Sequence, residues 1–99
     1  MQERDVEKRL VRGVRNQGGL CLKWVSPGFA GVPDRIVLLP GERLFFVELK
    51  QETGRLTKLQ RWVHGKLRDL GFPVIILYGP KDVELFLDFL KKRGDPHDL

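Results

Sequence analysis

The residues that could do chemistry lie at the ends of two apolar segments, within the stretch GVPDRIVLLPGERLFFVELKQ. Asp34 begins the first segment, and Glu48 and Lys50 end the second. Carboxylate oxygens bind hard cations such as Mg²⁺. A lysine beside such a cation can position or deprotonate a water, or neutralise charge that develops on a phosphate. The three residue types together predict a metal site that acts on phosphates.

Whether these side chains meet depends on how the two segments pair. Both segments have the composition of strands, and residues 40–42 between them form a Pro-Gly turn. If the turn has three residues, the pairing is symmetric about Gly41, and Asp34 faces Glu48 with Cβ atoms about 5 Å apart. Lys50 lies on the same face as Glu48, about 7 Å along the strand. A two-residue turn would shift the register and separate the group.

A metal would explain why two carboxylates face each other, because such a pair is otherwise repulsive. The backbone carbonyl of Leu49 is a further candidate ligand. Glu7 lies in the apolar stripe of a predicted first helix, bordered by Leu10 and Val14, where a carboxylate is costly without a partner or a metal. A metal-adjacent Glu7 is one interpretation, and a frayed helix end with Glu7 in solvent is the other. Glu3, nearer the end, is expected in solvent.

The apolar periodicity predicts an α/β domain in which helices cover a mixed sheet, in the order αβββαβα. The last strand has no polar face and is therefore expected at the centre of the sheet. The predicted helices are residues 2–17, 58–70 and 82–92, and the predicted strands are residues 20–25, 34–40, 43–50 and 73–79. In the second helix the residues expected to face inward are Leu59, Trp62, Val63, Leu67 and Leu70.

Length and composition indicate one globular domain over residues 1–99, with a tail at 93–99 that we expect to be flexible. The 18 Lys and Arg against 13 Asp and Glu give a net charge of +5, which favours a polyanionic partner such as nucleic acid. Ordinary solubility charge is the alternative. The single cysteine, Cys21, lies in an apolar run and is expected to be a buried structural thiol. Without a long apolar stretch or a signal-peptide pattern, a cytoplasmic protein with no membrane partner is expected.

Several other residues have a structural explanation. His64 and His97 have no metal-ligand spacing to another His or Cys and are expected in solvent. Trp24 and Trp62 are expected to pack in the core or against a loop. Gln60 fits a capping box with Thr57 as the N-cap residue, in which the glutamine side chain reaches back to the Thr57 amide.

Two sequence segments connect these residues to a known family. VPD and, 14 residues on from its aspartate, the glutamate of VELK resemble the motif of the PD-(D/E)xK nuclease superfamily, whose restriction-endonuclease-like core has the order αβββαβ. The run from EKRLVRG to ILYG resembles, more narrowly, the VRR-NUC (virus-type replication-repair nuclease) domain along nearly its full length. Its most specific parts are SPG…GVPDR, ELK…GRLTxxQ and LRDLG.

The resemblance implies a function and roles for particular residues. Asp34, Glu48 and Lys50 would be the catalytic trio, Glu7 the acid of the first helix and Gln60 the motif glutamine. The implied cofactor is Mg²⁺ or Mn²⁺. Short standalone members resemble phage and bacterial Holliday-junction resolvases, so the implied activity is structure-selective cleavage of DNA, at four-way junctions, by a homodimer. For Gln60 the capping role and the site role could coexist.

The remaining expectations concern partners. Candidate nucleic-acid contacts, for which a solvated face is the alternative, are Arg35, Arg55, Lys58, Arg61 and Ser26. The apolar residues of Val83–Leu90 cover more of the last helix than one core contact needs, which favours a homodimer interface there, or else burial in a small domain's own groove. The alternative functions are a non-catalytic DNA-binding module and a flap or nonspecific nuclease of the same fold. Facing carboxylates, which repel phosphate, favour the enzyme.

Overall fold

Residues 2–93, the part of the chain that the computed structural model describes, form three helices and four strands in the predicted order. The elements are α1 (Glu3–Asn16), β1 (Leu20–Lys23), β2 (Arg35–Leu39), β3 (Arg43–Lys50), α2 (Lys58–Asp69), β4 (Val74–Tyr78) and α3 (Gly79–Lys91). The tail beyond Arg93 and His97 lie outside the described residues. Helix α3 begins three residues before the predicted start, since Pro80 fits its first turn and the Asp82 carboxylate accepts a hydrogen bond from the Tyr78 amide at 2.8 Å.

The strands form one mixed sheet in the order β1-β2-β3-β4. Strand β2 pairs with both β1 and β3 in antiparallel orientation, and β4 pairs with β3 in parallel. The expectation that β4 lies at the centre is wrong, because β4 is the edge strand next to β3. Strand β4 is apolar on both sides because helices cover both faces of the sheet. This covering buries an edge strand as well as a central one, so an apolar strand need not be central.

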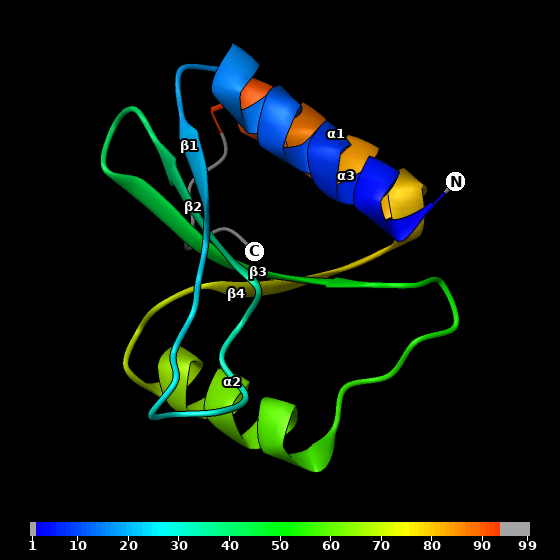
Figure 1. Cartoon of the computed structure of the whole chain (residues 1–99). Coiled ribbons are helices and arrows are strands. Elements are labelled where there is room, and N and C mark those ends of the chain that lie inside the picture. Colours follow the sequence, from blue (N-terminus) through cyan, green and yellow to red (C-terminus); the bar gives the residue numbers. More distant parts are fainter. Residues whose placement is uncertain (1, 94–99) are drawn as a thin grey trace.

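Helices α1 and α3 lie side by side on one face of the sheet, and α2 lies on the other (Figure 1). The main core fills the space between the sheet and the α1–α3 layer. It includes Leu10, Val14, Val37, Phe45, Val47, Val83, Phe86, Leu87 and Leu90. None of the helices in residues 2–93 is long and apolar enough to cross a membrane.

Helix α2 covers its face of the sheet only in part. Val63 is buried as predicted, whereas Leu59, Trp62 and Leu70 are 49%, 56% and 73% exposed. The spacing of apolar residues predicted which side of α2 faces the sheet. It could not predict that the sheet covers only the part of that side around Val63.

The apolar width of α3 is explained by the chain's own core. Val83, Phe86, Leu87 and Leu90 are buried against the sheet and α1, and Leu85 alone among the large apolar residues of α3 is largely exposed, at 61%. Of the two explanations for this width, burial within the domain is the one that the structure bears out. The reason for placing a dimer interface on Val83–Leu90 is thereby removed.

The layer of α1 and α3 depends on a close crossing at Gly13. A Cβ atom added there would lie 2.4 Å from Cδ1 of the buried Leu87. Nearby, the guanidinium of Arg9 binds both carboxylate oxygens of Glu84, at 2.6 and 2.8 Å, and so ties α1 to α3 at the surface.

We expect Gly13→Ala to lower the free energy of unfolding by about 1–3 kcal/mol, because Leu87 must leave its packed position. The matched control is Gly65→Ala in the middle of α2, where an added Cβ meets no atom within 4 Å. This variant should be stabilised by about 0.5–1 kcal/mol, since alanine favours helices more than glycine does. Urea unfolding of both variants measures the two effects, and equal shifts would contradict the close crossing.

Candidate active site

The turn between β2 and β3 brings Asp34 and Glu48 together. The pairing of the two strands is symmetric about Gly41, as predicted, and its last pair is Arg35 with Val47. Asp34 precedes this pair and Glu48 follows it, so the two carboxylates project from opposed positions at one end of the hairpin. The predicted register is therefore confirmed.

Glu48 is the buried acid of the site, with only 2% of its surface exposed. Its Oε2 atom accepts a hydrogen bond from Nε2 of Gln60 at 3.3 Å and lies 3.7 Å from Nζ of Lys50. Its Oε1 atom lies 3.8 Å from Nε2 of His64 and has no hydrogen-bond partner among the described residues. One buried carboxylate oxygen is thus left without a partner, which is costly.

This environment disfavours the charged form of Glu48. Burial raises the pKa of the Glu48 carboxyl to about 7, and the neighbouring Asp34 carboxylate acts in the same direction, while the Lys50 ammonium opposes both. Strongly raised carboxyl pKa values are typical of functional sites, where a charged group is held ready for a ligand that stabilises it.

Helix α2 presents Gln60 to Glu48 through its N-terminal cap. The Thr57 hydroxyl accepts a hydrogen bond from the Gln60 amide at 3.1 Å, and Gln60 Oε1 accepts one from the Thr57 amide at 3.0 Å. This capping box uses the oxygen of the glutamine side chain and leaves its Nε2 free to donate to Glu48. One side chain therefore both completes the capping box and contacts Glu48.

His64 is the residue that sequence reasoning missed. It was expected in solvent, yet its side chain is fully buried beside Glu48, and neither ring nitrogen has a hydrogen-bond partner among residues 2–93. Burial lowers its pKa, which favours the neutral imidazole. The available signal was its spacing, because His64 follows Gln60 by one helical turn and so shares its face.

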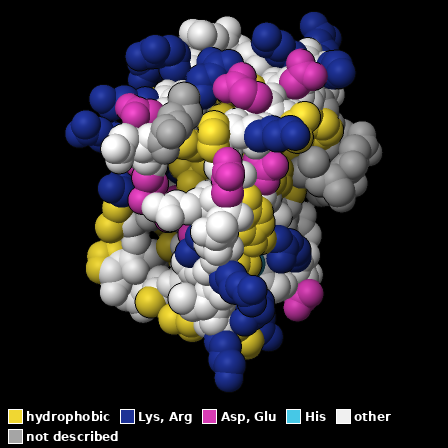
Figure 2. All heavy atoms as spheres, turned by 90° about the vertical axis from the view of Figure 1, so that its right-hand side faces the viewer, with side chains coloured by type: hydrophobic (Ala, Val, Ile, Leu, Met, Phe, Trp, Pro, Cys, Tyr) yellow, Lys and Arg dark blue, Asp and Glu magenta, His cyan; other side chains and the backbone are white. Residues whose placement is uncertain are grey.

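Asp34 anchors the open side of the site. Its Oδ2 atom accepts a hydrogen bond from the Leu49 amide at 3.0 Å, and its side chain borders an open hollow of about 390 Å³. The residues that line the hollow are Glu3, Asp34, Glu48, Leu49, Lys50, Gln51, Gly54, Arg55 and Gln60. Figure 2 shows this side of the molecule, where acidic side chains at the centre and in the upper half lie among Lys and Arg side chains.

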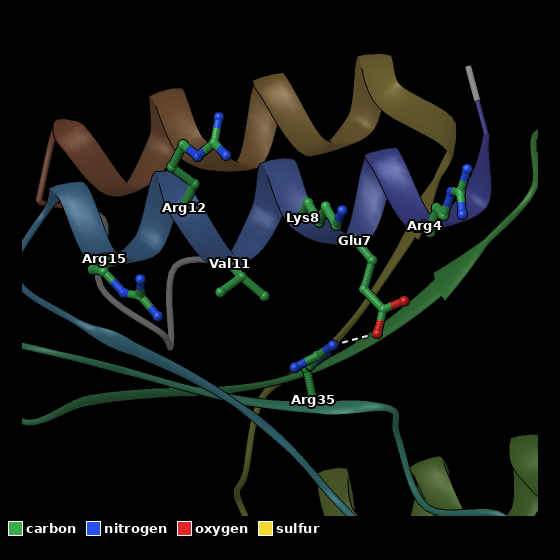
Figure 3. A pocket seen from close by; sticks show the side chains of 7 residues that line it. All are labelled: Arg4, Glu7, Lys8, Val11, Arg12, Arg15 and Arg35. Atoms are coloured by element: carbon green, nitrogen blue, oxygen red, sulfur yellow. Dashed lines mark hydrogen bonds and ion pairs between the residues drawn. The ribbon is translucent and has the colours of Figure 1, made fainter.

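The acid that α1 contributes to this hollow is Glu3 and not Glu7. Glu7 instead forms an ion pair with Arg35 (Figure 3), and both residues line a separate groove along α1. Glu7 has a protein partner, so neither a frayed end nor the hollow accounts for it. Sequence reasoning placed Glu7 near the apolar stripe but could not place Arg35 beneath it.

The predicted nucleic-acid contacts divide by position. Arg55 lines the hollow, and Lys58 and Arg61 are exposed on the first turn of α2. Ser26 lies in the loop after β1 and is not among the residues that line the hollow. Arg35 is not at the hollow either, because its half-buried guanidinium binds Glu7 and the Cys21 carbonyl.

Two other predictions are confirmed. Cys21 is buried, and this burial raises the pKa of its thiol to about 11, as expected of an unreactive structural cysteine. Trp24 is half-buried with its ring centroid 4.9 Å from that of Phe46, as expected of a packing residue, whereas Trp62 is largely exposed.

The donor set at the hollow fits a hard divalent cation. No group of three or more His, Cys, Asp or Glu side chains within residues 2–93 is placed to surround a metal. Asp34 and Glu48 supply two carboxylates, and this is the number with which proteins commonly hold Mg²⁺, the remaining positions being filled by carbonyls, waters or phosphate. A cation would also offset both the repulsion between the acids and the burial of the Glu48 charge.

In the absence of metal, the raised pKa of Glu48 makes stability depend on pH. The folded state holds the proton more tightly than the unfolded state does, so this contribution is complete below about pH 4.5 and is lost as the pH rises through about 7. We expect the free energy of unfolding in EDTA to fall by on the order of 2 kcal/mol more in the wild type than in Glu48→Gln between pH 5 and pH 8. Urea unfolding at both pH values measures this, and parallel pH profiles would contradict it.

Comparison with known proteins agrees with this architecture. No family model matches the sequence. A protein of Acyrthosiphon pisum secondary endosymbiont phage 1 named "Putative nuclease p44" is 46% identical over 77 residues, which are 78% of this chain and 83% of the phage protein. A solved structure described as a VRR_NUC domain superposes with a TM-score of 0.81 at 30% identity, over 87% of this chain and 94% of the other. On the grounds of sequence and fold together, the chain belongs to the VRR-NUC domain family.

Proposed function

We propose that this protein is a metal-dependent endonuclease that hydrolyses phosphodiester bonds in DNA. The observation that carries the proposal is the opposition of Asp34 to a buried Glu48, with Lys50 beside them, at an open hollow. A structural role for such a pair is disfavoured, because opposed carboxylates with a buried charge destabilise a fold. Membership of the VRR-NUC family and the name of the phage relative support the same activity.

Mg²⁺ or Mn²⁺ is the proposed cofactor, held by Asp34, Glu48 and the Leu49 carbonyl. The bound ion would polarise the phosphate and lower the pKa of a water. Hydrolysis joins the oxygen of a water to phosphorus and breaks one bond from phosphorus to a sugar oxygen. The proton of the water passes to solvent or to a nearby base, and the leaving sugar oxygen takes up a proton and becomes a hydroxyl.

The protein groups around the metal have distinct proposed roles. The ammonium of Lys50, 3.7 Å from Glu48 Oε2, offers hydrogen-bond donors and positive charge to the water and the phosphate. Gln60 fixes Glu48 by its hydrogen bond to Oε2. His64, buried on the other oxygen, excludes water from beneath the carboxylate. Glu3 and Arg55 border the hollow and would face the DNA.

The finer proposal is selectivity for branched DNA, with symmetric cutting of a four-way junction by a homodimer. Two symmetric cuts need two copies of the site related by a twofold axis. The support for this step is family resemblance and not a feature of the hollow itself. Sedimentation at micromolar concentration tests it, and a species of only 11.5 kDa would contradict it.

The activity is tested with four-way, flap, nicked and linear DNA, with and without Mg²⁺ or Mn²⁺. We expect cleavage only with metal, and a loss on the order of 10²–10³-fold in each of Asp34→Ala, Glu48→Gln and Lys50→Ala, because each removes part of the metal or phosphate environment. Lys66→Ala, on the exposed side of α2, is the control and should leave the rate unchanged. Metal-independent cleavage, or full activity in Asp34→Ala, would contradict the proposal. Binding of DNA without cleavage would indicate the non-catalytic alternative.

Gln60 allows its two roles to be separated. In Gln60→Glu the side chain can still accept the hydrogen bond from the Thr57 amide, so the capping box and the stability of α2 should be kept. It can no longer donate to Glu48, and it adds a third negative charge there, so we expect kcat to fall by about 10-fold or more.

Gln60→Ala should instead lose both the side-chain hydrogen bond from the Thr57 amide and the contact with Glu48, while the backbone bond to the Thr57 hydroxyl is kept, lowering the free energy of unfolding by about 1 kcal/mol. Thermal unfolding and single-turnover cleavage of the two variants measure the two roles. Wild-type kcat in Gln60→Glu would show that the hydrogen bond to Glu48 has no part in catalysis.

A further inference from the structure

A groove of about 380 Å³ runs along the outer side of α1, separate from the hollow of the proposed active site (Figure 3). The residues that line it are Arg4, Glu7, Lys8, Val11, Arg12, Arg15 and Arg35. The lining has five cations and one carboxylate, a formal charge of +4, against +5 for the whole chain. Most of the net charge of the protein is therefore concentrated here.

Four of these cations form one stripe. At about 100° per residue, Arg4, Lys8, Arg12 and Arg15 lie within about 80° of the helix circumference. With a rise of 1.5 Å per residue the stripe is about 16 Å long. Each of the four side chains is exposed, and within residues 2–93 none of them forms an ion pair. Arg9, on another side of the same helix, is paired with Glu84.

Most of the stripe does not serve the stability of α1, and only Arg15, in the last turn, lies where the helix dipole favours a cation. Arg4 with Lys8, and Lys8 with Arg12, are like charges one helical turn apart, an arrangement that destabilises a helix. Arg4 also lies in the first turn, where the helix dipole favours negative charge. An external polyanion that approaches the groove would remove both penalties.

The floor of the groove does not weaken the positive charge of the stripe. The single carboxylate, Glu7, is neutralised by its ion pair with Arg35, whose side chain is 14% exposed. Figure 3 shows Glu7 pointing down from α1 onto Arg35 while Val11 points to the same side. The pair thus closes the groove without presenting a free negative charge to a ligand.

The groove is continuous with the proposed active site along the chain. Glu3 and Asp34 line the hollow, and the next residues, Arg4 and Arg35, line the groove. Asp34 lies with Glu48 on the α2 side of the sheet, whereas Arg35 binds Glu7 on the α1 side, so the two sites adjoin at the first turn of α1, where Arg4 follows Glu3. The lining offers no aromatic ring for a base to stack on and no amide side chain to read a base edge.

Building on the proposed nuclease function, we propose that this groove binds the phosphate backbone of the duplex DNA flanking the cleaved bond. A length of about 16 Å corresponds to about five steps along the axis of the duplex, at about 3.4 Å per phosphate of one strand. The contacts would fix the position and direction of the duplex relative to Asp34 and Glu48 and leave the chemistry to the hollow.

The test compares Lys8→Gln/Arg12→Gln with Lys66→Gln/Lys91→Gln, which removes the same charge from exposed positions on α2 and α3. Binding of a labelled duplex is measured by fluorescence anisotropy in EDTA over a range of salt concentrations. We expect the groove variant to bind about 10-fold or more weakly at 0.1 M salt and its slope of log K against log salt to become shallower by about 1.8, or about 0.9 per lost contact. The control pair should keep the wild-type slope.

Three further readouts decide the remaining points. In Mg²⁺ or Mn²⁺ the groove variant should show a raised KM with unchanged kcat, and its unfolding in urea should show no loss of stability, since like-charge contacts are removed. An unchanged salt slope would overturn the groove, even if the protein cuts DNA. A changed slope in a protein that never cuts DNA would keep the groove and reject the nuclease. Equal loss of binding to single strands or to polyglutamate would overturn the assignment to duplex DNA.

Discussion

The constraint on which the structure depends is the burial of one negative charge, the carboxylate of Glu48, in the middle of a sheet. Three elements are needed to hold it. The hairpin brings Asp34 and Lys50 to it, and α2 supplies Gln60 and His64 to its two oxygens. The α1–α3 layer keeps the opposite face of the sheet dry and rigid, so β3 can place the side chain without support from solvent. A bound cation would offset the cost of burying the Glu48 carboxylate beside the Asp34 carboxylate.

The parts that could be predicted from sequence are those that depend on local geometry. Strand residues alternate with a period of two, and a Pro-Gly turn has few lengths, so residues 34–50 predicted the opposition of Asp34 to Glu48 for a three-residue turn, and the observed pairing selects that turn. The capping box at Thr57 is likewise a four-residue pattern. In both cases the local structure is encoded within a short stretch of chain, so the sequence reduced the possibilities to one or two.

The parts that could not be predicted depend on contacts between distant segments. Which acid of α1 faces the hollow depends on how α1 packs against the sheet and against α3, and this packing joins segments far apart in the sequence, such as Gly13 and Leu87. His64 is buried where α2 packs on the sheet, 3.8 Å from the Glu48 carboxylate that β3 contributes. The position of β4 at the edge is likewise a property of chain topology, to which the hydrophobicity of a single strand is blind.

The part of the site that depends on the cap of α2 is less stable than the rest of the domain. Helix α2 buries only Val63 and His64, fewer side chains than α1 or α3, and it carries large exposed apolar residues. Segments with few buried contacts open locally at a lower free energy than the whole domain unfolds. Opening the first turn of α2 breaks the hydrogen bond from Gln60 to Glu48, while the sheet and the α1–α3 core can stay folded. The fold and the geometry around Glu48 therefore have different free energies of opening. Amide hydrogen exchange in α2 measures the free energy that holds the geometry around Glu48.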